Sequence, residues 1–187
     1  MSKRSVVSRP HSIVIHKDDD SLASIAAQML VSGIQYGQPA LLITAGGHLD
    51  AVRDKLSTER IDPDDLIAAG WLTVVDAETL LNVLMVGDVP DPIRFRHMAG
   101  SLLEQLCATR EVCIPVIYSD MAGRLWRRGN KAAALSLEIL WNGLATAYNF
   151  SLICGYYGDP SVTSAPTLEE LEAICQQHNE IIEMRPN

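Results

Sequence analysis

Short apolar runs alternate with amphipathic segments along most of the chain. The runs are rich in valine, isoleucine and leucine, as is typical of strands buried on both faces, and they lie at residues 12–16, 40–44, 71–75, 112–118 and 150–154. Between them, apolar residues recur at the spacing of one helical face, which predicts helices near residues 22–30, 48–56, 77–85, 93–109, 121–128 and 131–148. Because strands joined by helices imply parallel crossovers, we predict an α/β fold with a mainly parallel sheet sandwiched by helices. Pro115 removes a backbone donor and so favours an edge position or a bulge for the fourth strand.

The end of the chain carries a separate helical signal. Residues 167–170 form a Thr-Leu-Glu-Glu capping box, and the apolar stripe that follows predicts an amphipathic helix over 167–184. The preceding stretch is rich in serine, proline and threonine, so it is interpreted as a linker. The predicted organisation is a flexible N-terminus at 1–10, an α/β domain at 11–158, a linker at 159–166 and a C-terminal amphipathic helix at 167–187. The stripe of that helix either packs on its own sheet or forms a homodimer.

The composition is that of a folded, acidic protein. With 187 residues, of which 48% are hydrophobic, the chain can bury a core. Fifteen Lys and Arg against twenty-three Asp and Glu give a net charge of −8, which argues against direct binding of nucleic acid or of an anionic membrane. No apolar run approaches the ~20 residues that span a bilayer, and no secretory signal is recognisable, so a cytoplasmic location is expected. The cysteines lack C-x-x-C spacing and are predicted to be free thiols: Cys107, Cys113, Cys154 and Cys175.

Polar residues follow several of the predicted strands, where parallel sheets bind their ligands. Residues 16–20, His-Lys-Asp-Asp-Asp, either form a site for a cation or a hydrogen-bond donor or simply cap a helix. The Gly-Gly turn within 44–48 either admits a ligand or only connects a strand to a helix, and Tyr-Ser-Asp at 118–120 either recognises a polar ligand or caps a helix. The candidate ligand-binding residues are therefore His16, Asp19, His48, Tyr118, Asp120 and Tyr156.

Catalytic and metal-binding patterns are not recognised in the sequence. The five histidines lie far apart and form no H-x-x-x-H pair, so no metal site is predicted from their spacing. There is no G-x-S-x-G elbow, and no Ser-His-Asp arrangement can be inferred. We therefore predict no catalytic residues and no cofactor. An enzyme stays an open alternative, with Asp120 or His16 as its acid or base.

A basic segment in the second half of the chain surrounds a tryptophan. Arginines and a lysine flank it without intervening acids, which suits an acidic patch of a partner protein, although a solvated helix end has the same composition. The candidate partner-binding residues are Trp126, Arg127 and Arg128.

Three segments carry a resemblance to a known family. They are Leu125-Trp126-x-x-Gly129-Asn130, Leu137-Glu138-x-x-Trp141-Asn142 and Phe150-Ser-Leu-Ile-Cys154-x-Tyr156, and His11-Ser-Ile-Val-Ile-His16 adds to them. With these, the chain resembles the MEDS family from about residue 11 to residue 157. The family comprises sensory domains of methanogens, of methylotrophs and of a dichloromethane-responsive regulator, related to KaiC and RecA-like ATPase cores. They often precede histidine kinase or DNA-binding modules, so the resemblance implies signal reception rather than turnover.

The resemblance also assigns individual residues. The Tyr-Gly-Glu-Met segment of the family is matched by Tyr-Ser-Asp-Met at 118–121, with a shorter acid and no glycine, and His16 stands where an aromatic residue is usual. A KaiC-like Gly-Lys-Thr loop is absent, because residues 17–20 are Lys-Asp-Asp-Asp, so we predict no nucleotide hydrolysis. The resemblance implies a structural motif, in which helix packing and buried hydrogen bonds are the expected roles, formed by Asn130, Glu138, Trp141 and Asn142.

The sequence as a whole predicts a non-catalytic, RecA-like signal-sensing domain that lacks a P-loop. It would bind an unknown small molecule, a signalling protein such as a histidine kinase or a transcription regulator, or both. Two alternatives stay open. One is an interaction adaptor without a small ligand, and the other is a degenerate KaiC-like nucleotide-binding protein.

Overall fold

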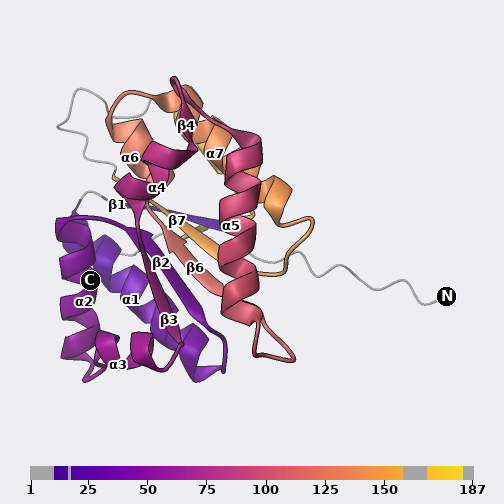
Figure 1. Ribbon diagram of the computed structural model, residues 1–187. Helices are drawn as coiled ribbons and strands as arrows, with labels where there is room; N and C mark the ends of the chain where they lie inside the picture. The colour runs from indigo at the N-terminus through magenta and orange to yellow at the C-terminus, as the bar shows by residue number, and fades with distance from the viewer. Residues whose placement is uncertain (1–10, 17, 158–167, 183–187) are drawn as a thin grey trace.

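The protein folds around one parallel sheet. The computed structural model describes residues 11–16, 18–157 and 168–182 (Figure 1). Its six-stranded sheet has the order β3-β2-β6-β7-β1-β8, and every pair of neighbours in it is parallel. The strands are β1 (His11–His16), β2 (Ala40–Thr44), β3 (Leu72–Asp76), β6 (Val116–Ser119), β7 (Ser151–Tyr157) and β8 (Glu180–Ile182), and a separate hairpin pairs β4 (Met85–Val86) with β5 (Val89–Pro90). The predicted α/β fold is confirmed.

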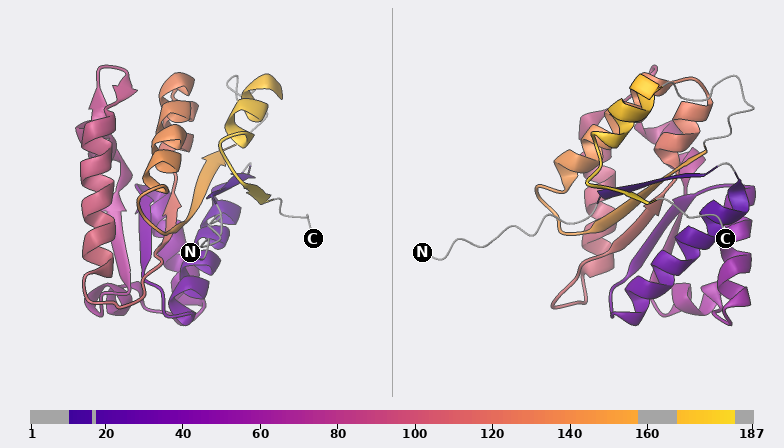
Figure 2. Two further views of the ribbon diagram at one scale, coloured as in Figure 1. Left: turned by 90° about the vertical axis from the view of Figure 1, so that its right-hand side faces the viewer. Right: turned by 180° about the vertical axis from the view of Figure 1, so that it is seen from behind.

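Helices cover both faces of the sheet. They are α1 (Asp19–Gln35), α2 (Gly47–Thr58), α3 (Pro63–Ala68), α4 (Ala77–Leu84), α5 (Pro92–Cys107), α6 (Met121–Arg127), α7 (Lys131–Leu144) and α8 (Leu168–Cys175). One core packs α1 and α2 against the sheet, and a larger core packs α4, α5, α6 and α7 on the opposite face (Figures 1 and 2). Among the described residues, no helix is both long enough and apolar enough to cross a bilayer.

Side chains alternate along β1, so successive residues pack into cores on opposite faces of the sheet. Ile13 faces the larger core with the helices α4 to α7, whereas Val14 packs with residues of α1. Both side chains are fully buried, as expected for a strand inside a parallel sheet. This division decides which polar groups of β1 and β7 meet at each face.

The position of β6 differs from the prediction. Pro115 lies just before the strand, which begins at Val116 and pairs with β2 and β7 in the middle of the sheet. The proline therefore removes no donor from the ladder, and its carbonyl accepts a hydrogen bond from the backbone N–H of Ser151 (2.9 Å). The predicted edge position is wrong, because a proline immediately before a strand is compatible with a central place.

The C-terminal segment also differs from the prediction. The helix ends at Cys175, and the chain then returns to the sheet as β8, beside β1, so a helix over 167–184 is wrong (Figure 2). Asn179 makes this turn, because its backbone N–H donates to the carbonyl of His11 (2.8 Å) and its side chain accepts from the N–H of His11 (3.2 Å). The flexible N-terminus predicted at 1–10 and the linker at 159–166 lie outside the described residues.

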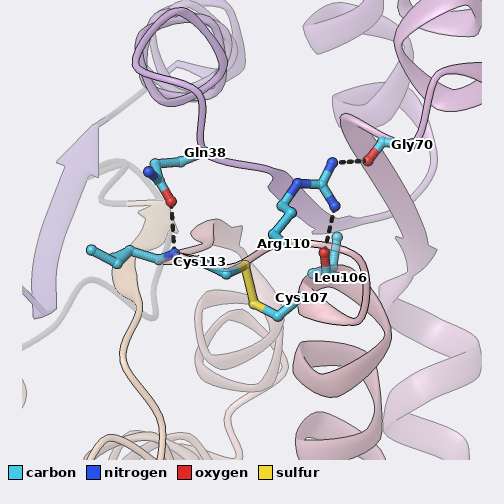
Figure 3. The surroundings of a disulfide bond; sticks show 7 residues. Gln38, Gly70, Leu106, Cys107, Arg110 and Cys113 are labelled. Carbon is cyan, nitrogen blue, oxygen red and sulfur yellow. Dashed lines mark hydrogen bonds between the residues drawn. A yellow bond between two sulfur atoms is a disulfide. The ribbon is translucent and has the colours of Figure 1, made fainter.

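Two of the cysteines predicted to be free form a disulfide. Cys107, at the end of α5, is bonded to Cys113 in the loop before β6 (Figure 3). Hydrogen bonds fix the same loop, because Gln38 accepts from the N–H of Ile114 (2.7 Å) and Arg110 donates to the carbonyl of Gly70 (2.8 Å). Sequence spacing does not reveal this pair, since a turn brings the two side chains together only after α5 ends.

Replacement of both of these cysteines by serine is expected to lower the free energy of unfolding by about 2 kcal/mol. The closed loop is short, with a sequence separation of 6, so the cross-link removes only a modest amount of entropy from the unfolded chain. Urea unfolding under non-reducing conditions measures the difference. The free cysteine Cys175 serves as the control, since Cys175→Ser closes no loop. Equal stability of the double variant and the parent would contradict the prediction.

Candidate functional site

Four side chains form a hydrogen-bonded chain at the carboxyl ends of the strands. We call Asp19, His48, Tyr118 and Tyr157 the edge network. The carboxylate oxygen Oδ1 of Asp19 accepts from the Tyr157 hydroxyl (2.5 Å) and lies in close contact with Nδ1 of His48. The other ring nitrogen of His48, Nε2, lies 2.9 Å from the hydroxyl of Tyr118. The side chain of Asp19 is 46% exposed and that of His48 only 1%, so the network runs from the surface into the interior.

Local sequence places each member of the edge network. Asp18 caps α1 through the N–H of Ser21 (2.8 Å), which sets Asp19 in the first turn. Gly46 adopts a left-handed φ of 61°, and this turn delivers His48 to the buried start of α2. A Cβ on Gly155 would lie 2.3 Å from the Tyr118 hydroxyl, so a glycine is required where that phenol crosses β7.

The direction of the hydrogen bonds follows from the carboxylate. Asp19 only accepts when ionised, so Nδ1 of His48 donates to it and Nε2 is left to accept from the Tyr118 hydroxyl. Burial raises the pKa of Tyr118 well above its ordinary value, so the phenol keeps its proton. Burial and the hydrogen bond to Asp19 also raise the pKa of Tyr157. The network is therefore a chain of hydrogen-bond donors that ends on one half-exposed carboxylate.

A second set of charged groups lies at the neighbouring strand ends. We call Thr44, Glu78, Asp120, Arg124 and Arg128 the arginine network. The guanidinium of Arg124 donates to both carboxylate oxygens of Asp120 (2.7 Å each), and Oδ2 of Asp120 also accepts from the Thr44 hydroxyl (2.7 Å). Arg124 then reaches Glu78 (3.0 Å), which accepts from Arg128 as well (2.5 Å). Hydrogen bonds from Arg128 and Arg124 lower the pKa of Glu78 although burial opposes them.

A third group of polar side chains is buried on the opposite face of the sheet. We call His11, Glu138, Cys154 and His178 the histidine cluster. Nε2 of His11 lies 3.1 Å from Oε2 of Glu138, and the Cys154 thiol lies 3.2 Å from the same oxygen. His178 completes the group, with Nε2 3.5 Å from that oxygen. Burial opposes the charge of Glu138, but the neighbouring imidazoles of His11 and His178 hold its pKa well below its usual range.

The structure brings together some of the predicted ligand-binding residues and separates others. Asp19, His48 and Tyr118 meet in the edge network, and Asp120 lies beside them in the arginine network. Tyr156 is on the other face, where its hydroxyl donates to Oε1 of Glu138 (2.6 Å), so its assignment to the same pocket is wrong. In its place Tyr157 joins Asp19, since successive residues of a strand point to opposite faces.

The prediction for His16 is also corrected. Its Nδ1 lies 2.8 Å from the carboxylate of Asp18, and neither nitrogen contacts the edge network. The Asp18 carboxylate is in turn held by the N–H of Ser21, and this hydrogen bond lowers the pKa of Asp18. His16 therefore contacts the N-cap residue of α1 rather than the candidate ligand site.

Of the three predicted partner-binding residues, the two arginines are exposed and the tryptophan is buried. Trp126 is 3% exposed and packs edge-to-face on Tyr156, so it is a core residue. Arg127 and Arg128 are exposed, as predicted. The guanidinium of Arg127 lies 4.7 Å from the centre of the Tyr157 ring, which connects this surface to the edge network.

The four residues of the structural motif have the expected kinds of contact. Asn130 caps α7 by accepting from the N–H of Ala133 (3.1 Å), and Trp141 packs edge-to-face on Phe95 and Phe150. Glu138 and Asn142 both reach His11, with Nδ1 of that ring 2.8 Å from the amide oxygen of Asn142. The motif therefore includes the centre of the histidine cluster, and helix packing alone does not account for it.

The histidine cluster contradicts an argument drawn from the sequence. The spacing of the histidines along the chain predicts no metal site, yet the rings of His11 and His178 are 4.3 Å apart. Residues 11 and 178 meet because β8 pairs with β1, and no local pattern indicates this pairing. Alternation along β7 is the one signal that could have placed Cys154 and Tyr156 on one face and Tyr157 on the other.

The fold and these networks define a parallel α/β domain with hydrogen-bonding side chains gathered at the carboxyl ends of its strands, the usual place for a ligand in this class. The chain belongs to the MEDS family, described as the methanogen/methylotroph, DcmR sensory domain, whose model matches residues 10–178. The family is one of sensory domains, which is consistent with a role in signal sensing.

Similarity to solved structures is distant. Among solved structures, a KaiC-like protein from the archaeon Pyrococcus horikoshii OT3 is 17% identical, with a TM-score of 0.46. The match covers 82% of this chain and 66% of that chain. No curated protein matches the sequence significantly.

Proposed function

We propose that this MEDS domain is a non-catalytic signal sensor that binds a small polar ligand at the edge network and signals to a partner protein through Arg127. One observation carries the proposal. Asp19 Oδ1 accepts from both His48 and Tyr157, and the guanidinium of the exposed Arg127 packs on the ring of Tyr157. A change at one carboxylate oxygen therefore reaches both the buried tyrosine Tyr118 and the surface.

The exposure of Asp19 makes it the point of ligand entry. Hydrogen bonds to a charged group contribute about 1.5–3 kcal/mol each, so a ligand that donates to Asp19 competes directly with Tyr157 or His48. Displacement of Tyr157 would release the ring that supports Arg127. A ligand that offers a hydroxyl or amine donor fits this site best, because the accepting atom is a carboxylate oxygen.

The buried end of the network favours sensing over catalysis. Asp19, His48 and Tyr118 form an acid-histidine-hydroxyl series, but the Tyr118 side chain is fully buried against Gly155. Its hydroxyl is therefore not presented to a substrate. Nucleotide hydrolysis is disfavoured as well, because three aspartates at 18–20 occupy the start of α1, where a P-loop protein binds phosphate.

Native mass spectrometry of the full chain tests the ligand proposal. The intact protein is expected to carry, or to take up from a panel of small alcohols and amines, a small-molecule increment that is lost on denaturation. The variant combining Asp19→Asn with Tyr157→Phe should lose that increment, whereas Asp50→Asn, an exposed acid in the first turn of α2, should keep it. Added ATP is expected to leave the mass unchanged.

The same experiment separates the rival functions. An increment that persists in the Asp19 and Tyr157 variant would place the ligand elsewhere. Binding of ATP would favour the degenerate nucleotide-binding protein. Uptake of nothing from the panel would favour an adaptor without a ligand, whose surface would be the exposed Arg127 and Arg128.

A further inference from the structure

We propose that the histidine cluster binds one divalent transition-metal ion, with Zn²⁺ as the best match to its donors. Nε2 of His11, Oε2 of Glu138, Sγ of Cys154 and a ring nitrogen of His178 all lie within 4.8 Å of one another. Two imidazoles, a thiolate and a carboxylate are the ligand types that zinc takes in proteins. This site lies on the other face of the sheet from the edge network, so the inference stands apart from the proposed ligand.

The spacing of the donor atoms suits a tetrahedral ion. Bonds of about 2.1 Å to nitrogen or oxygen and about 2.3 Å to sulfur place tetrahedral ligands roughly 3.3–3.8 Å apart. In the cluster, Oε2 of Glu138 lies 3.1 Å from His11, 3.2 Å from Cys154 and 3.5 Å from His178, and the His11 nitrogen lies 3.4 Å from the Cys154 sulfur. These four distances are within a few tenths of an ångström of a tetrahedral shell, and the His178 nitrogen lies within 4.8 Å of the other donors.

Hydrogen bonds outside the cluster fix both imidazoles in the orientation that a metal requires. Nδ1 of His178 lies 2.7 Å from the carbonyl of Ile174, which can only accept, so that nitrogen carries a proton. Nδ1 of His11 lies 2.8 Å from the amide oxygen of Asn142, whose NH₂ group donates to the carbonyl of Gln177 (2.9 Å). In the neutral rings, both Nε2 lone pairs consequently point into the cluster. Metal-bound histidines have this arrangement, with the second nitrogen held by an oxygen acceptor.

One of these nitrogens has an unmet bonding capacity. The side chain of His178 is fully buried, and its Nε2 has no hydrogen-bond partner among the described residues. A buried polar atom without a partner is costly, and here it is aimed at a carboxylate and a thiol. A cation between these groups would satisfy the nitrogen and neutralise Glu138. With a thiolate at Cys154, the two negative ligands balance the charge of a divalent ion, which makes its burial favourable.

The origin of the ligands indicates what the ion would do. They come from β1, α7, β7 and the turn between α8 and β8, so one ion would join the C-terminal segment to the centre of the sheet. Tyr156 holds the other oxygen of Glu138 (2.6 Å) and so orients the carboxylate. Four protein ligands close the coordination shell, which is typical of a structural metal rather than of a catalytic one.

Metal titration of the full-length protein, after dialysis against a chelator, tests the site. We expect one Zn²⁺ per chain, a higher Tm with Zn²⁺ than after its removal, and a cobalt-thiolate charge-transfer band when Co²⁺ is the probe. Cys154→Ser should abolish that band, and His178→Gln should weaken the binding of Zn²⁺ at least about 100-fold. Cys175→Ser and His97→Gln are the matched controls and should leave both readouts unchanged.

Each other outcome overturns the proposal. Sub-stoichiometric binding would contradict the site, and a band that survives Cys154→Ser would show that another cysteine binds the cobalt. Circular dichroism checks that the variants fold, and His178→Gln decides the matter if Cys154→Ser does not. The histidine cluster and the edge network share no residue, so failure of this test does not contradict the proposed ligand site. Asp19→Asn should leave the metal content unchanged.

Discussion

Replacement of Arg124 by alanine is expected to lower the free energy of unfolding by about 3–5 kcal/mol, since breaking a buried ion pair leaves an uncompensated charge. The charge in question is Asp120, whose side chain is fully buried and whose two oxygens both accept from the guanidinium. The same guanidinium donates to the carbonyl of Ala45 (2.6 Å), so this acceptor would lose its donor as well. Urea unfolding followed by circular dichroism measures the loss.

The neighbouring arginine provides the matched control. Arg128 pairs with Glu78 near the surface, with about half of its side chain exposed, so Arg128→Ala should cost no more than about 1 kcal/mol. The double variant Asp120→Asn with Arg124→Gln should cost less than the sum of its single changes, because neither partner is then left charged. Equal losses for Arg124→Ala and Arg128→Ala would contradict the buried role of Arg124.

Most of the fold could be predicted because its signals are local. The apolar runs at β2 and β7 are buried on both faces, and aspartates at positions 18, 76 and 91 cap the helices that follow them. The exceptions depend on partners distant in the chain. A central place for β6 requires β2 and β7 on either side of it, and β8 forms because β1 offers an open edge.

The candidate sites could be predicted only in part, for the same reason. Asp19 and His48 meet because each lies in the first turn of a helix that follows a strand. The choice between Tyr156 and Tyr157 required the phase of β7, which the sequence alone does not define. The position of His178 could not be predicted from the sequence, because it approaches His11 through the pairing of β1 with β8.

Gly123→Ala is the second substitution for which we expect a large loss of stability, because α6 approaches β7 closely at this residue. A Cβ at Gly123 would lie 2.2 Å from the carbonyl oxygen of Gly155 and 3.1 Å from Cα of Tyr156. Both atoms belong to the backbone of a central strand, which cannot yield as a flexible side chain would. Gly123→Ala should therefore cost about 3 kcal/mol or more, at the upper end of overpacking, in a helix where alanine would otherwise be favoured. Urea unfolding again gives the value.

The control is Gly143, another helical glycine, whose surroundings differ from those of Gly123. Gly143 lies in α7 with no atom within 4 Å of a Cβ built on it, so Gly143→Ala should be neutral or stabilising by up to about 1 kcal/mol. The contrast between the two substitutions isolates the contact with β7 from helix propensity. Because α6 carries Arg124 and Arg127, and β7 carries Cys154 and Tyr157, separation of these elements should weaken both proposed sites together. A stable Gly123→Ala protein with unchanged metal binding would show that α6 can move away from β7 without cost.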